Sequence, residues 1–160
     1  MTPDNISEVL KEQLCQIVEG VAFMFIECDA VPLPVPTAGI EVRLNFSGPS
    51  EGAIWLALSV EDSNRLAAGM LGRPLAETLG PDQAAPAEFL NILGNWVLDA
   101  LWGSEAPFQV AVPSVEAKQL DSTVVWSLPA ARRVIVLTDA ECTILCGITL
   151  NQEDEDSQTA

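Results

Sequence analysis

The chain has 160 residues and a net charge of −16, from 23 acidic and 7 basic residues, and it contains no histidine. This length is typical of one domain with a substantial core, and apolar residues make up 49% of the sequence. So acidic a surface repels phosphate backbones, which argues against DNA or RNA as a partner. The charge either favours a partner with a basic patch or serves solubility alone.

The sequence contains no membrane or export signal of the usual kinds. No apolar run reaches the roughly 18 residues that a membrane-spanning helix needs. The first residues lack the basic and apolar regions of a signal peptide. We therefore expect a cytoplasmic protein that neither binds nor spans a membrane. In that compartment the four cysteines are expected to be small buried hydrophobic residues, namely Cys15, Cys28, Cys142 and Cys146.

The first half of the chain predicts a helix, a hairpin and a second helix. Apolar residues recur at helical spacing from Pro3 to Gly20. Apolar and polar residues alternate from Gly39 to Phe46, and turn residues separate this strand from a second one at Ala53 to Leu58. Ser59 can cap the next helix, and Gly72 can end it.

The second half predicts one long helix, Pro86 to Trp102, followed by strands. Four alternating, β-branched segments follow it: Phe108 to Leu120, Ser122 to Leu128, Arg132 to Thr138 and Cys142 to Leu150. Their short connections imply antiparallel pairing, so we predict an α+β fold with helices packed on an antiparallel sheet. We expect one domain over residues 1–150, then an acidic, disordered tail at 151–160.

One face of the long helix carries only acids and amides. When the helix is wound at about 100° per residue, four polar side chains share an arc of about 80°: Glu88, Asn91, Asn95 and Asp99. Apolar side chains are expected on the opposite side: Phe89, Leu93, Trp96, Val97 and Ala100.

Because the chain has no histidine, it can build neither a Ser-His-Asp triad nor a Cys-His pair. With no metal-ligand cluster or nucleotide motif either, carboxylates and carboxamides are the available catalytic groups.

The pair Glu88 and Asn91 is the candidate catalytic site. At this spacing both side chains leave the same helix face and can enter one cleft. The amide can hold a water by donating and accepting at once, and the carboxylate can pair with a lysine of a docked protein. Hydrolysis of a phosphoryl group needs mainly positioning and electrostatics, so these two groups can suffice.

A structural explanation of Glu88 competes with this one, since an acid is favoured near any helix N-terminus. The same spacing recurs at Glu61 and Asn64, where capping explains both residues and a second site is left open.

Four short segments place this pair in a wider pattern. They are, in chain order, Phe46-Ser47-Gly48 with Gly52-Ala53-Ile54-Trp55-Leu56, then Met70-Leu71-Gly72, then Glu88-Phe89-Leu90-Asn91-Ile92-Leu93, and finally Val112-Pro113-Ser114-Val115. Together they resemble the CheX branch of the CheC/CheX/FliY phosphatases of bacterial chemotaxis. In the same order, the corresponding features of that family are its F-x-G…G-x-apolar strand pair, its mlG helix end, its E-x-x-N-I-I signature and its P-x-v segment.

The resemblance implies a CheC/CheX-like fold and dephosphorylation of the aspartyl-phosphate of a CheY-type response regulator. In the family the Glu pairs with a lysine of the regulator and the Asn places the attacking water. These roles fall on Glu88 and Asn91. The regulator supplies Mg²⁺, so no cofactor is expected on this chain. Asn95 either extends the water site or makes a capping or interhelical hydrogen bond. Asp99 either meets a basic residue of the partner or is a solvated acid. The resemblance also implies a homodimer joined through its sheets.

Two departures from the family pattern support an alternative function. Gly94 and Asn95 come one position earlier than the corresponding Gly and Asn of the family, and Pro86 is unusual so close to the motif. Both can change how the helix presents Glu88 and Asn91. The alternative is a CheX-like domain that binds a regulator without catalysis, or an interaction domain of the flagellar-switch type.

Overall fold

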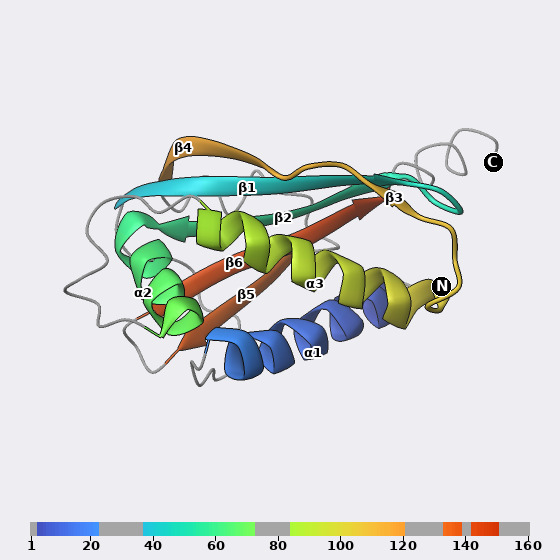
Figure 1. Cartoon of the computed structure of the whole chain (residues 1–160), viewed down its shortest axis with the longest axis horizontal. Coiled ribbons are helices and arrows are strands. Elements are labelled where there is room, and N and C mark those ends of the chain that lie inside the picture. Colours follow the sequence, from blue (N-terminus) through green and yellow to red (C-terminus); the bar gives the residue numbers. More distant parts are fainter. Residues whose placement is uncertain (1–2, 23–36, 73–83, 121–132, 139–141, 151–160) are drawn as a thin grey trace.

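The computed structural model describes residues 3–22, 37–72, 84–120, 133–138 and 142–150. In these residues three helices cover one face of an antiparallel sheet (Figure 1). The helices are α1 (Pro3–Ala22), α2 (Val60–Leu71) and α3 (Ala84–Trp102). The strands are β1 (Thr37–Ser47), β2 (Gly52–Ser59), β3 (Gln109–Val110), β4 (Ser114–Leu120), β5 (Arg133–Thr138) and β6 (Cys142–Leu150). The predicted α+β fold is confirmed.

The order of the strands in the sheet is β3-β1-β2-β6-β5, and β4 also pairs with β1. The predicted β1–β2 hairpin is confirmed, with Val42 opposite Leu56. Because β2 occupies one edge of β1, both β3 and β4 pair with its other edge, β3 near Phe46 and β4 from Thr37 to Arg43. The edge strand beside β1 therefore consists of two separate pieces.

This division corrects the prediction of one continuous strand from Phe108 to Leu120. The chain leaves the regular ladder at residues 111–113, between β3 and β4. Pro113 has no N–H to donate and is tolerated only at an edge or an interruption of a sheet. The Ala111 N–H still donates to the Asn45 carbonyl at 2.9 Å. The strand predicted at Ser122 to Leu128 lies outside the described residues, as does the predicted tail at 151–160.

Local signals account for the ends of α2 and α3. The Ser59 hydroxyl accepts a hydrogen bond from the Asp62 N–H at 3.0 Å, and Gly72 ends α2 with a φ of 64°. This left-handed conformation suits glycine because it has no Cβ. Pro86 is the third residue of α3, where an N–H would have no partner within the helix in any case. The proline is therefore compatible with the start of this helix.

A single core joins the three helices to the sheet. Its strand residues come from alternate positions, such as Val42, Leu44, Ile54, Leu56 and Ile148, all fully buried. Gly94 of α3 faces this layer, and a Cβ built on it would lie 2.3 Å from Leu44 Cδ2. The absent side chain therefore lets α3 approach β1 closely.

The cysteines only partly follow the prediction. Cys146 of β6 is a free and fully buried thiol. Cys15 of α1 is half-buried and disulfide-bonded, which corrects the expectation of a small buried hydrophobic residue at this position. That expectation rested on compartment and composition, whereas a disulfide depends on which cysteines the fold brings within about 4.4–6.8 Å of one another at Cα. Cys28 and the side chain of Cys142 lie outside the part that the structure describes.

Cys146 is expected to lower the stability of the protein at alkaline pH. Burial raises the pKa of its thiol from 9.0 to about 12. Between these values the unfolded chain loses the proton while the folded chain keeps it. Stability therefore falls as pH rises, by about 1.4 kcal/mol per pH unit. Urea unfolding of wild type and Cys146→Ala at several pH values from 8 to 11 checks this. If the difference in unfolding free energy between the two proteins does not depend on pH, the expectation is wrong.

Candidate functional site

The exposed side of α3 carries the predicted polar residues. Glu88, Asn95 and Asp99 are exposed and Asn91 is half-buried, whereas Phe89 lies on the fully buried side. These exposures agree with the arc that helical winding predicts. The polar arc is therefore accessible to a partner molecule.

Two of the residues expected on the apolar side of α3 are instead exposed. The Trp96 side chain is 44% exposed, and Ala100 is also exposed. The helix therefore turns a different side to the core than predicted. This side includes Leu90, Gly94 and Leu98, which are all buried. The absence of a side chain at Gly94 permits this orientation, since a Cβ there would lie 2.3 Å from Leu44 Cδ2 of β1.

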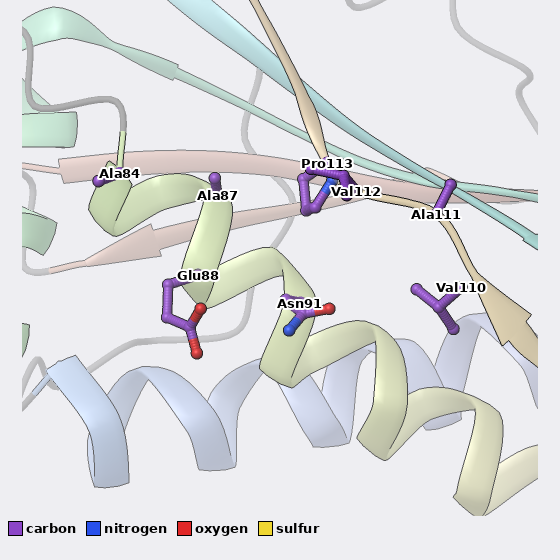
Figure 2. Close-up of a pocket in the computed structure, with 8 residues that line it drawn as sticks. All are labelled: Ala84, Ala87, Glu88, Asn91, Val110, Ala111, Val112 and Pro113. Carbon is purple, nitrogen blue, oxygen red and sulfur yellow. The ribbon is translucent and has the colours of Figure 1, made fainter.

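Glu88 and Asn91 line an open groove of about 400 Å³. The start of α3 forms one wall, with Ala84 and Ala87 beside the two polar residues. The other wall is the segment 110–113, where the edge of the sheet changes from β3 to β4 (Figure 2). The interruption that Pro113 introduces thus faces the candidate catalytic pair.

The two polar side chains differ in their position within the groove. In the view of Figure 2 the Asn91 amide lies between Glu88 and Val110, and the Glu88 carboxylate points away from Pro113. Within the part of the chain that the structure describes, neither side chain has a hydrogen-bond or ion-pair partner. Both groups therefore keep their full capacity to bind a water molecule or a partner residue.

The remaining two candidates lie further along the helix and do not line this groove. The Asn95 Nδ2 donates to the backbone carbonyl of Asn91 at 2.8 Å. This bond lies within α3, so it is neither the capping nor the interhelical bond that the sequence suggested. Asp99 is exposed one turn beyond Asn95. Their expected contacts with a partner stay predictions.

The fold has known counterparts, although no protein-family model and no curated protein sequence matches the chain. CheX from Desulfovibrio desulfuricans matches it with a TM-score of 0.66, over 92% of this chain and 99% of that chain, at 13% identity. The chain has the CheX fold.

Other proteins with this fold are similar at the same level. CheX in the CheX–CheY–BeF3–Mg²⁺ complex from Borrelia burgdorferi has a TM-score of 0.60 and 14% identity, covering 89% of this chain and 96% of that one. FliY from Thermotoga maritima has a TM-score of 0.58 and 14% identity, and the match covers 95% of this chain and 92% of that one. The match to the CheX/CheC/FliY fold thus covers nearly the whole chain.

The second Glu-x-x-Asn pair in this CheX fold has a different environment. Glu61 forms an ion pair with Arg65, one turn further along α2, at 3.1 Å. Its carboxylate therefore already has a cation, whereas Glu88 has none in the described residues. Of the two pairs, Glu88 and Asn91 are the better placed to bind a cation from another protein.

Residue-by-residue reading of the sequence missed the second wall of the groove. The sequence connects the Val112-Pro113 segment with the CheX resemblance alone and predicts no role for it in the site. One signal was present, because a proline inside an alternating run marks an interruption or an edge. What that signal cannot show is that the interruption faces Glu88.

An aromatic cluster holds the chain that leads into this wall. Trp102, at the end of α3, contacts Phe108 with ring centroids 5.1 Å apart. Phe46 of β1 contacts both rings, at 6.5 and 5.7 Å. The cluster links the end of α3 to β1 just before β3, and so helps to fix the segment that forms the wall.

Two further observations concern the described residues as a whole. No helix among them is long and apolar enough to span a membrane. No three acidic, cysteine or histidine side chains among them come together as a metal-binding cluster.

Proposed function

We propose that this protein binds a phosphorylated CheY-type response regulator in the cytoplasm and hydrolyses its aspartyl-phosphate at Glu88 and Asn91. The observation that carries the proposal is the placement of both side chains, without partners in the described part of the chain, in one open groove. The fold supports it, since a CheX of the same fold forms a complex with CheY, BeF3 and Mg²⁺.

In the proposed reaction Glu88 binds the regulator and Asn91 positions the attacking water. The Glu88 carboxylate accepts a charge-assisted hydrogen bond from a lysine ammonium of the regulator, which fixes the regulator over the groove. The Asn91 amide orients one water in line with the phosphorus. The water oxygen forms a bond to phosphorus while the bond from phosphorus to the aspartate oxygen breaks. The products are inorganic phosphate, which takes up the proton of the water, and a free aspartate carboxylate. The regulator would hold the Mg²⁺ that neutralises charge on the phosphoryl group.

The direct test is the decay of phosphorylated CheY-type regulators from the same organism, with and without this protein. We expect faster release of inorganic phosphate from at least one regulator. A regulator that binds tightly but decays at its own rate would support the non-catalytic alternative. The predicted homodimer is tested separately, by the molar mass of the protein in solution.

Glu88→Gln is expected to weaken regulator binding by about tenfold or more, because it replaces a charge-assisted hydrogen bond with a neutral one. Binding by the wild type should also weaken as salt increases, and binding by the variant should respond less. Titration calorimetry at two salt concentrations measures both effects.

Glu61→Gln is the matched control for this change, since Glu61 is exposed and paired with Arg65 on a different helix. We expect it to bind the regulator as the wild type does. Equal weakening by both variants would show that the net charge of the protein, rather than the groove, attracts the regulator.

A further inference from the structure

Large apolar side chains are exposed at three places in the described residues: Leu71 (48%), Trp96 (44%) and Val112 (90%). Two of them belong to the two segments that form the candidate site. Val112 lines the groove on the wall opposite α3. Trp96 lies two turns after Glu88 in the same row of the helix surface, with the half-buried Ile92 between them.

We propose that Trp96 and Val112 are apolar anchors for the phosphorylated response regulator, on opposite sides of the Glu88–Asn91 pair. This inference rests on the proposed function and adds the residues that select and hold the partner. Burial of the exposed valine and the exposed tryptophan under a partner would remove apolar surface from water and so stabilise the complex. Tryptophan is also among the residues that most often dominate the energetics of an interface.

The geometry of α3 places the two anchors on either side of the catalytic pair. With Glu88 at zero, helical winding puts Asn91 near 300° and Trp96 near 80°. The groove and Val112 lie on the Asn91 side of Glu88. At 1.5 Å per residue, Trp96 is about 12 Å beyond Glu88 along the axis. One regulator domain can cover this span, since a standard interface buries about 800 Å² on each partner.

The charge of α3 indicates what the partner surface must offer. The helix contains two acids, Glu88 and Asp99, and no lysine or arginine. A fitting partner therefore presents basic groups together with an apolar pocket. Apolar contacts on both sides would also exclude water from the centre and strengthen the pairing of Glu88 with a lysine there. This combination favours a protein surface over a small anionic ligand.

The test is calorimetric binding of CheY-type regulators from the same organism, each in its BeF3- and Mg²⁺-bound form, whether or not the decay assay shows acceleration. Trp96→Ala is expected to weaken binding about tenfold or more and Val112→Ser about threefold. Leu71→Ala is the matched control, because this exposed side chain ends α2 and does not line the groove, and it should bind as the wild type does.

Several outcomes would overturn the inference. One is unchanged binding by both Trp96→Ala and Val112→Ser. Another is a change in the molar mass of the free protein on Trp96→Ala, which would assign Trp96 to contacts between copies of this chain. Val112→Ser keeps the test valid if Trp96→Ala does not fold, since Val112 is almost fully exposed.

The inference and the proposed function can fail separately. If the wild type does not accelerate decay but Trp96→Ala weakens binding of any activated regulator, the anchors are supported and catalysis is excluded. If the wild type accelerates decay and both variants bind normally, catalysis is supported and the anchors are excluded.

Discussion

Asn91→Ala is expected to reduce the acceleration of regulator dephosphorylation by about 100-fold or more, while regulator binding changes by less than about threefold. The variant removes only the amide that orients the water. The Asn91 side chain has no hydrogen-bond partner in the described residues, so the substitution leaves no group of the fold unpaired. The decay rate at saturating protein and the affinity for the BeF3-bound regulator are the two quantities to measure.

The control for this substitution is Asn45→Ala. Asn45 is an exposed asparagine of β1 that does not line the groove containing Glu88 and Asn91. Its loss should leave the decay rate unchanged. A normal decay rate with Asn91→Ala would contradict the proposed mechanism, even if the wild type is an active phosphatase, because the water would then be positioned by another group.

Gly94→Val is expected to lower the free energy of unfolding by about 2–3 kcal/mol. A Cβ at this position would lie 2.3 Å from Leu44 Cδ2 and 3.7 Å from Ile54 Cδ1. Overpacking of this kind costs about 1–3 kcal/mol. The branched side chain adds strain, while the better helix propensity of valine offsets only a few tenths of a kcal/mol. Gly94→Ala should be far milder, because the terminal methyl of Leu44 can move and alanine gains about 1 kcal/mol in helix propensity.

Urea unfolding measures this effect, with Gly20→Val as the matched control. Gly20 also lies within a helix, but a Cβ there would meet nothing within 4 Å. Equal stability of Gly94→Val and Gly20→Val would show that α3 does not depend on the contact. A partial rescue of Gly94→Val by Leu44→Ala, which opens the space that valine needs, would assign the loss to this pair of residues.

The same contact explains one departure from the family pattern. A Cβ on Gly94 would lie 2.3 Å from Leu44 Cδ2 of β1, so the position of this glycine has a packing reason in the chain itself. Pro86 likewise occupies the first turn of α3, where it causes no loss of a hydrogen bond. These two residues, which suggested a non-catalytic protein, thus have structural explanations that leave Glu88 and Asn91 accessible.

The sequence by itself determined the helices, the hairpin and the polar face of α3. Ser59 and Gly72 predicted the ends of α2 because capping depends on atoms within a few residues of one another. Glu88 and Asn91 were placed on one exposed face because helical winding is the same in every α-helix. Both kinds of prediction rest on interactions close in sequence, and the structure confirms them.

Only the tertiary structure decided what lies opposite Glu88 and Asn91 and which way α3 is turned. The groove exists because β3 and β4 pair with β1, which brings residues 110–113 to the start of α3. Trp96 is exposed because α3 turns Leu90 and Leu98 to the core, an orientation that the absence of a side chain at Gly94 permits. The disulfide at Cys15 also depends on which cysteines the fold brings together. Such contacts join residues distant in sequence, and they depend on side-chain packing that no local pattern specifies.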